Sequence, residues 1–200
     1  MIEKLPTLVQ LLKQLQQIPY LASKNVYRVA HYLLDMNPKK AEQLCATILE
    51  AKKNIVRCNT CCSWQERTQT CLFCDNSKRD QAIICVVETW QEQISIEKAG
   101  GYNGVYHILG GVICPLEGMG PEDLTIDGLL ARCNNGITQE IILATNQTPE
   151  GEATAAYIAH KLKGNPVKIS CLARGIPVGS SLEFMDRVTI FKALSERRPF

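Results

Sequence analysis

The sequence predicts an α/β protein in which a helical amino-terminal part and a small cysteine cluster precede the main sheet. Three observations predict this fold class. Apolar residues recur at helical spacing before residue 55, four cysteines form two close pairs between residues 58 and 74, and apolar β-branched runs alternate with helical segments from residue 82 onward. With 200 residues, 46% of them hydrophobic and 21% charged, the chain is long enough to bury a core, and disorder is not expected.

Three short amphipathic helices are expected before the first cysteine pair. In the first, apolar residues at i, i+3, i+4, i+7 and i+10 share one face until Pro19 ends the helix, and the next two helices have similar spacing. The short connection over residues 18–24 predicts a helical hairpin. The apolar positions of the three helices are, in order, Leu5, Leu8, Val9, Leu12 and Leu15; Val26, Val29, Ala30, Leu33 and Leu34; and Ala41, Leu44, Cys45, Ile48 and Leu49.

The charge is distributed unevenly along the chain. Residues 1–57 hold nine Lys or Arg against four Asp or Glu, a net charge of +5, whereas the whole chain carries only +2. A basic amino-terminal third favours a polyanionic partner such as nucleic acid, although a charge excess alone also fits a merely solvated surface.

The amino-terminal residues MIEKLPTLVQ are interrupted by charge and lack the apolar core of a secretory signal. No apolar run approaches the roughly 18 residues expected of a membrane span. Ten cysteines without an export signal predict a reducing, cytoplasmic compartment. In such a compartment, close cysteine pairs more often bind metal than form disulfides.

Four thiolates are available for one tetrahedral ion, because Cys58-x-x-Cys61 and Cys71-x-x-Cys74 lie nine residues apart. Such a site has no open position for water or substrate, so we expect a structural Zn²⁺; two disulfides or unrelated buried thiols are the alternative. Cys62 competes with Cys61 as a ligand, although the spacing favours Cys61. The other cysteines are expected to be small core residues: Cys45, Cys85, Cys114, Cys133 and Cys171.

From residue 82 the chain alternates between strand-like and helical segments. Four apolar runs, AIICVVE, VYHILGG, EIILATN and PVKISCLARG, alternate with helical segments around residues 90–98, 122–133 and 151–163. This order predicts a mostly parallel sheet with helices on both faces.

Taken in order, these features resemble the RecR family of bacterial recombination proteins. The resemblance covers nearly the whole chain. It implies a helix-hairpin-helix-like domain over 1–56, a C4 zinc finger over 57–78, a Toprim domain over 79–176 and a carboxyl-terminal oligomerisation segment over 177–200. Besides the cysteine cluster, its most specific segments are ICVVE at 84–88, YHILGG at 106–111, GPED at 120–123, ATN at 144–146, EGE at 150–152 and ARGIPVG at 173–179.

The resemblance also implies what the sheet edge does. In catalytic Toprim domains, a Glu after the first strand and an Asp-x-Asp after a later strand hold magnesium for phosphoryl transfer. In this chain Glu88 has the first position, but Ala144-Thr145-Asn146 replaces the second. One carboxylate beside a neutral amide is a poor magnesium site, so the chain is expected not to be an enzyme. The alternative is a residual magnesium-dependent nuclease or primase-like enzyme that uses Glu88, Asn146, Glu150 and Glu152.

The implied function is that of a DNA recombination and repair mediator. Such a protein forms a homo-oligomeric ring, possibly a tetramer, that binds gapped, single-stranded or double-stranded DNA. With RecO or RecF it helps to load the RecA strand-exchange protein. An acidic surface of Glu88, Asn146, Glu150 and Glu152 is expected to engage the partner, while the two last carboxylates equally fit a helix-dipole role. A zinc-stabilised adaptor that never touches DNA is a further alternative.

The expected DNA contacts are Lys24 and Arg28, which stand four residues apart after the predicted hairpin turn. They match the Lys and Arg that follow a Pro-Gly-Ile-Gly-like turn in the family. The turn itself departs from the family, because residues 19–22 read Pro-Tyr-Leu-Ala and both glycines are missing. An ordinary solvated charge pair is therefore the alternative, and Tyr20 either stacks on a base or packs against Tyr27.

Overall fold

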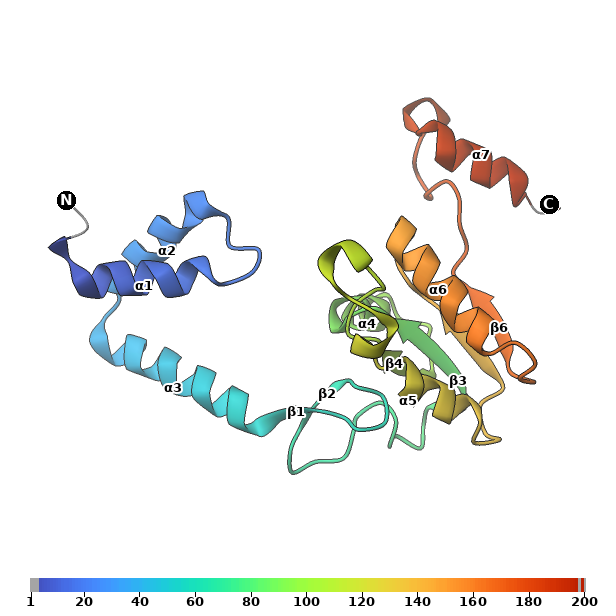
Figure 1. The fold of residues 1–200 in the computed structure, drawn as a ribbon, viewed down its shortest axis with the longest axis horizontal. Helices are drawn as coiled ribbons and strands as arrows, with labels where there is room; N and C mark the ends of the chain where they lie inside the picture. The colour runs from blue at the N-terminus through green and yellow to red at the C-terminus, as the bar shows by residue number, and fades with distance from the viewer. Residues whose placement is uncertain (1–3, 198, 200) are drawn as a thin grey trace. The chain divides into compact units, whose positions relative to one another are not determined.

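The computed structural model describes residues 4–197 and residue 199, and the chain divides into two compact units with the boundary between Ile55 and Val56. Figure 1 labels the α-helices and, except for β5, the strands within each unit. The first unit contains the helices α1 (Pro6–Gln16), α2 (Ser23–Asp35) and α3 (Pro38–Asn54). The strand β1 (Ile55–Arg57) begins at the boundary. The second unit contains, in chain order, the rest of β1, β2 (Trp64–Glu66), β3 (Asp80–Val87), α4 (Trp90–Ala99), β4 (Gly104–Ile108), η2 (Pro115–Glu117), η3 (Pro121–Asp123), α5 (Ile126–Cys133), β5 (Glu140–Leu143), α6 (Pro149–Lys161), β6 (Lys168–Cys171), η4 (Leu182–Phe184) and α7 (Arg187–Ser195).

In the first unit, α1 and α2 form the predicted helical hairpin. Leu12 and Leu15 of α1 pack with Val26 and Ala30 of α2, so the apolar faces read from the sequence meet each other. Leu34 is an exception, because its side chain is 62% exposed near the end of α2. The helical spacing identified the apolar face of α2, but it did not indicate that α1 leaves the last turn of this face uncovered.

The third helix, α3, has the predicted amphipathic pattern but buries no residue. Its start is defined by Asn37, whose side chain accepts a hydrogen bond from the backbone N–H of Lys39. Leu44, Ile48 and Leu49 are 40%, 58% and 70% exposed. The apolar face of α3 was expected to be part of a core. In this chain it is left uncovered, because α1 and α2 bury their apolar faces against each other.

The second unit is built on a four-stranded, fully parallel sheet in the order β4-β3-β5-β6. All four predicted strands are present, and the predicted parallel sheet is confirmed. The chain enters the sheet at β3, adds β4 on one side and then continues on the other side with β5 and β6. The carboxyl ends of β3 and β5 therefore lie at the point where the order of strands reverses, which is where open α/β sheets commonly bind ligands.

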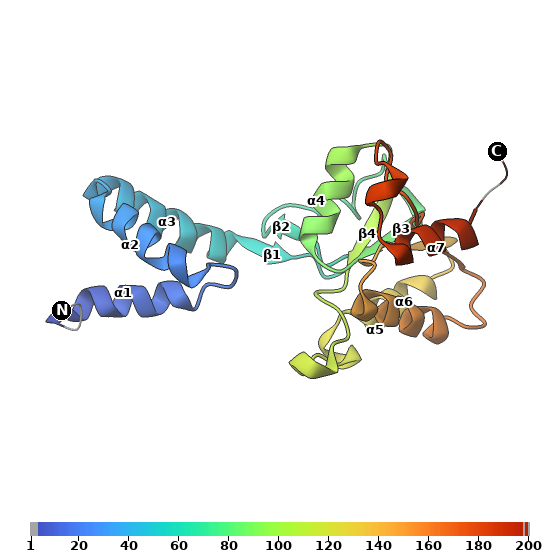
Figure 2. The same cartoon turned by 90° about the horizontal axis from the view of Figure 1, so that it is seen from above.

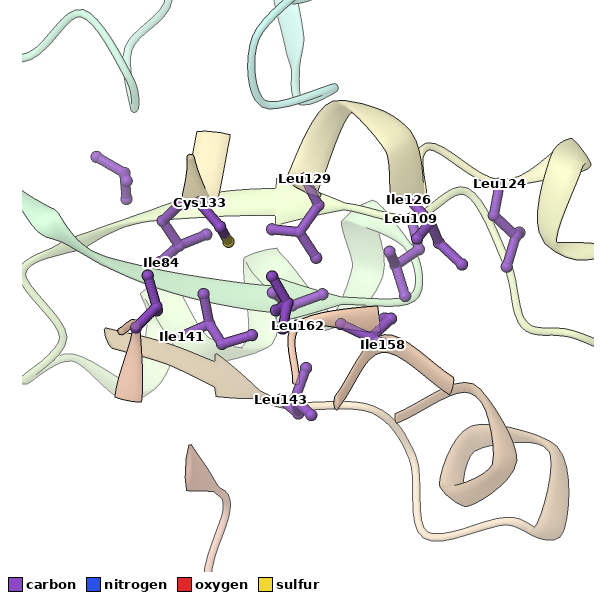
Figure 3. Packing of buried hydrophobic residues seen from close by; sticks show 13 residues of the cluster. Ile84, Leu109, Leu124, Ile126, Leu129, Cys133, Ile141, Leu143, Ile158 and Leu162 are labelled. Carbon is purple, nitrogen blue, oxygen red and sulfur yellow. The ribbon is translucent and has the colours of Figure 1, made fainter. Parts of the chain in front are cut away.

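Both faces of this sheet are covered, as predicted, and Figure 2 shows α4 on one side with α5 and α6 on the other. Alternate residues of β3 divide between the two faces. Ile84 and Val86 belong to a core with α5 and α6, which Figure 3 shows from close by. Cys85 and Val87 belong to a second core, against which Phe73 and Ile96 pack.

The cysteines outside the cluster do not share one environment. Cys85 and Cys133 are buried, as expected, and Cys114 is partly buried. Cys45 and Cys171 are exposed, so the expectation of a core position was wrong for these two residues. The reason is the uncovered face of α3 for Cys45 and the end of the edge strand β6 for Cys171.

The carboxyl-terminal helix α7 begins at Asp186, whose side chain accepts hydrogen bonds from the backbone N–H groups of Val188 and Thr189. No residue of α7 is buried. Val188, Phe191 and Leu194 are 64%, 70% and 61% exposed, so its apolar side chains face solvent in a single chain.

Among the described residues, no helix combines the length and the apolar character that crossing a membrane requires.

Candidate metal centre and binding surfaces

The four predicted metal ligands come together in one cluster. The Sγ atoms of Cys58, Cys61, Cys71 and Cys74 all lie within 4.8 Å of one another, and three of these residues are buried. Cys58 and Cys74 are 3.4 Å apart at sulfur, as are Cys61 and Cys71. The cluster can hold one metal ion. Within the described part of the chain, no second group of three or more His, Cys, Asp or Glu side chains does so.

Local hydrogen bonds shape each cysteine pair into a tight turn. The backbone N–H of Cys62 donates to the carbonyl of Cys58 at 2.9 Å, and the N–H of Thr60 donates to the Cys58 sulfur at 3.4 Å. In the second turn, the N–H of Cys71 donates to the carboxylate of Asp75 at 2.9 Å. These turns aim both sulfurs of a pair at one point, as two residues between ligands allow.

The sulfurs also change one another's protonation. The hydrogen bond with Cys71 is the main cause that raises the pKa of Cys61 to about 12. The same contact is the main cause that lowers the pKa of Cys71. Four thiolates this close repel one another without a cation, so a bound ion would stabilise the deprotonated set.

Cys62 lies outside the ligand cluster. The sequence had left open whether Cys61 or Cys62 is the metal ligand, and the structure favours Cys61. The four clustered sulfurs do not include that of Cys62, whose side chain instead packs against the core formed by Cys85, Tyr106 and Ile108. Its backbone has φ 61°, in the left-handed region that non-glycine residues rarely adopt. Cys62 therefore occupies the sharp turn after the second ligand of its pair.

The cysteine cluster is docked onto the sheet domain. The backbone N–H of Ile108, at the end of β4, donates to the carbonyl of Cys61 at 3.0 Å. The buried side chains of Gln93 and Ser63 form a hydrogen bond of 2.9 Å between α4 and the cysteine turn. Formation of the metal centre is thereby coupled to the packing of α4 and β4.

Arg79 provides a further link between the cysteine cluster and the sheet. Its guanidinium donates to Glu97 at 2.6 Å and to the carbonyl of Gly104 at 3.0 Å. The same group lies over the rings of Phe73 and Tyr106, at 5.2 and 5.7 Å from their centroids. The hydrogen bond to Glu97 is the main cause that raises the pKa of Arg79. Arg79 therefore contacts the residue next to Cys74, the first helix of the sheet domain and β4 at once.

At the reversal point of the sheet, the structure joins Glu88 to Asn146. Glu88 follows β3 and is only 7% exposed. One of its carboxylate oxygens accepts the backbone N–H of Asn146 at 2.6 Å, and the other accepts the Asn146 side-chain amide at 2.7 Å. Glu88 and Asn146 are thus brought together, as the resemblance to catalytic Toprim domains implied. Asn146, however, offers an amide donor where those domains have carboxylates.

A neighbouring carboxylate, Glu92, is directed to the start of α4. It completes a capping box, in which it accepts hydrogen bonds from the backbone N–H at 2.8 Å and from the hydroxyl of Thr89. Desolvation raises the pKa of Glu92, but these hydrogen bonds outweigh it and the net shift is downward. Sequence reasoning did not single out Glu92, although the Thr-x-x-Glu pattern at a helix start was a usable signal.

The remaining two predicted carboxylates lie in the first turn of α6. Glu152 accepts hydrogen bonds from Lys192 at 2.7 Å and from Arg174 at 3.2 Å, and so ties α6 to the carboxyl-terminal segment. The contact with Lys192 is the main cause that lowers the pKa of Glu152. The backbone carbonyl of Glu150 accepts the hydroxyl of Thr154 at 2.7 Å. Glu152 therefore has a structural contact in addition to its place in the helix dipole.

In the first unit, Lys24 and Arg28 are both exposed on α2, one turn apart on the same side. The preceding loop contains Tyr20, whose side chain is fully exposed and whose φ of 66° lies in the left-handed region. Tyr20 stands at the first of the two positions where the resemblance to the RecR family implies a hairpin glycine. The turn geometry that glycine favours is therefore adopted without glycine, and the cations follow it.

We expect Tyr20→Gly to stabilise the first unit by about 0.5 to 1 kcal/mol, since glycine removes a left-handed strain of roughly 1–2 kcal/mol but loses more chain entropy on folding. The exposed ring contributes no burial that would offset this gain. Urea unfolding of the full chain, followed by circular dichroism, measures the change. Tyr20→Ala is the matched control, because it removes the ring but keeps the Cβ atom. If Tyr20→Ala raised the free energy of unfolding as much as Tyr20→Gly, backbone strain at this position would not be the cause.

The comparisons with known families match the carboxyl-terminal three-fifths of the chain. Residues 82–173 match the family model of the Toprim domain. Directly after it, residues 175–198 match the model described as RecR, C-terminal. The first match contains the sheet with Glu88 and Asn146, and the second contains α7.

Proposed function

The chain belongs to the RecR family, whose domains indicate a role in DNA recombination and repair, and we propose that it acts as a mediator that works by binding. In this proposal it is a multimeric DNA clamp or adaptor. With RecO or RecF it helps to load RecA onto gapped or single-stranded DNA in the cytoplasm. The observation that carries the proposal is the RecR carboxyl-terminal match directly after the Toprim match, because the Toprim fold alone also serves enzymes.

The geometry around Glu88 supports binding over catalysis. Both carboxylate oxygens of Glu88 accept hydrogen bonds from Asn146, at 2.6 and 2.7 Å. A magnesium site for phosphoryl transfer uses several carboxylate oxygens around the ion, and an amide donor pointing at the buried Glu88 carboxylate opposes this arrangement. Magnesium-dependent cleavage of DNA that disappears in Glu88→Ala would overturn this part of the proposal.

For the metal centre we propose zinc. Four sulfurs bound at about 2.3 Å to a tetrahedral ion lie about 3.8 Å apart. The two sulfur pairs at 3.4 Å are close to this separation, so the cluster fits the ion with little movement. Zinc bound to four thiolates has no open position, and its role is to join the two cysteine turns.

Oligomerisation is supported by apolar side chains that a single chain does not cover. These occur on α3, with Ile48 and Leu49, and on α7, with Val188 and Phe191. Partner binding is assigned to the surface around Asn146 and Glu150. Glu88 accepts the side-chain amide of Asn146, and Glu152 accepts a hydrogen bond from Lys192 of the carboxyl-terminal segment.

The DNA contact is assigned to Lys24 and Arg28, and removing both is expected to weaken binding of gapped DNA. Because each neutralised phosphate contributes about 0.7 to 0.9 to the slope of log K against log salt, the slope should fall by about 1.4 to 1.8 in Lys24→Ala/Arg28→Ala. Fluorescence anisotropy of labelled gapped DNA at several salt concentrations measures both slopes.

The control is Lys39→Ala/Lys40→Ala, which removes the same charge from the first unit at the start of α3. It should keep the slope of the unmodified chain. Equal salt slopes in all three proteins would contradict a DNA contact at Lys24 and Arg28. If the folded, metal-loaded chain did not bind DNA at all, the adaptor role would be the remaining proposal.

A further inference from the structure

A cavity of about 190 Å³ lies outside both the metal cluster and the Glu88–Asn146 pair. It is formed by the β1–β2 hairpin, the start of α4 and the end of β4. The cavity is smaller than the 300–1,000 Å³ that is common for small-molecule sites, so it suits one ring system better than a whole cofactor. Its principal lining residues are Arg57, Trp64, Thr89, Trp90, Ile108 and Gly110.

The chemistry of the lining is aromatic and cationic. The chain has two tryptophans, and both line this cavity with side chains that are 42% and 44% exposed. The guanidinium of Arg57 lies over the ring of Trp64, 5.3 Å from its centroid. Among residues 4–197 and 199, no carboxylate forms an ion pair with Arg57. Two partly exposed indoles beside a cation without an acidic partner form a surface that suits a flat, anion-linked group.

The walls are held in place by the elements already described. The capping box of Thr89 and Glu92 defines the first turn of α4 and thereby the position of Trp90. Gly110 has φ 91° and donates its N–H to the carbonyl of Glu88 at 2.9 Å. A Cβ atom at Gly110 would come within 3.4 Å of the Arg57 guanidinium, so glycine leaves room for this side chain. The cavity is therefore formed before any ligand arrives.

We propose that this cavity receives one unstacked base of single-stranded DNA. Trp64 and Trp90 provide the stacking surfaces, and Arg57 neutralises the adjacent phosphate. A base in an intact duplex is stacked and paired and enters only after unstacking, so the site selects single strands. The inference rests on DNA as the ligand of the proposed function, but it uses residues of the second unit and not the Lys24–Arg28 contact.

The two tryptophans make the test direct, because both line this cavity and the tryptophan emission of the full, metal-loaded chain, excited selectively over the tyrosines, therefore reports on it. Titration with an oligothymidylate of about twelve nucleotides, a length within the range that single-strand sites cover, should quench the emission. A blunt duplex should not. Trp64→Phe and Trp90→Phe, each with one tryptophan left, show whether both indoles respond.

Affinity is measured separately with a labelled oligothymidylate. Arg57→Ala and Trp90→Leu should each weaken binding. For Trp90→Leu, the loss of one base–aromatic stack should reduce the affinity by roughly 5- to 160-fold. Lys98→Ala is the matched control for Arg57→Ala, because it removes one exposed cation from the opposite end of α4. Metal content and circular dichroism check that each variant is folded.

The outcomes separate this inference from the proposed function. Binding by anisotropy without tryptophan quenching, or with no loss in Arg57→Ala and Trp90→Leu, overturns the cavity site and leaves the hairpin contact intact. Equal quenching by single strand and duplex also overturns it. Quenching that persists in Lys24→Ala/Arg28→Ala supports the cavity as a separate site. If the oligothymidylate quenches the emission but Lys24→Ala/Arg28→Ala keeps the salt slope of the unmodified chain, the hairpin assignment fails and the base site stands.

Discussion

Substitution of Cys61 by serine is expected to abolish metal binding and to unfold the cysteine cluster. Structural zinc contributes apparent folding free energies of about 10–16 kcal/mol in isolated finger peptides, so loss of one of four thiolates should cost this chain more than about 3 kcal/mol. The loss extends beyond the cluster, because the same turn docks on the sheet domain: the backbone carbonyl of Cys61 accepts the N–H of Ile108, and Ser63, two residues on, accepts the side-chain amide of Gln93. Metal analysis and thermal unfolding, with tryptophan emission as the probe of the second unit, measure the effect.

Cys62→Ser is the control, since it makes the same chemical change one residue away. The sulfur of Cys62 is not in the ligand cluster, so this variant should keep one ion per chain. Chelation of the unmodified chain should reproduce the Cys61→Ser phenotype. Metal loss in both variants would show that Cys62 is a ligand and would contradict the geometry.

The strands and helices of this fold could be predicted because the spacing of their apolar residues indicates directly which side of each element is buried. Ile84 and Val86 alternate with Cys85 and Val87, and the two pairs lie in different cores. The cysteine ligands were equally readable, since the two-residue spacing within each pair is a local property of the chain. Glu88 and Asn146 could be placed together through the resemblance to Toprim domains, and they meet in the structure because the carboxyl ends of neighbouring parallel strands lie at one edge of the sheet.

The features that were missed depend on contacts between distant segments or on backbone geometry. Arg57, Trp64 and Trp90 meet only after β1, β2 and α4 are placed against the end of β4. The helical pattern of α3 predicted an apolar face, but a period carries no information about what covers that face in one chain. Nothing in the residue types indicated the left-handed backbone at Tyr20, which non-glycine residues rarely adopt.

Gly151→Ala is expected to destabilise the second unit by about 2 to 3 kcal/mol, because the added methyl group overlaps fixed backbone atoms. A Cβ atom at Gly151 would lie 2.2 Å from the carbonyl oxygen of Asn146 and 2.8 Å from the Glu88 carboxylate. Relief requires α6 to move away from the end of β5, and this movement separates Asn146 from Glu88. The glycine between the two glutamates is thus explained by close packing, and the variant should also weaken partner binding at this edge.

Gly128→Ala provides a control of opposite sign. Gly128 also lies in a helix, α5, but the added Cβ would meet its nearest neighbour, the His107 ring, at an ordinary 3.6 Å. Alanine is the better helix former, so this variant should gain about 0.5 to 1 kcal/mol. In urea unfolding followed by tryptophan emission, the midpoint should move down for Gly151→Ala and up for Gly128→Ala, at an unchanged slope.

A Gly151→Ala midpoint equal to that of the unmodified chain would mean that α6 and β5 are not in close contact at this point. The Glu88–Asn146 pair would then lose its structural support.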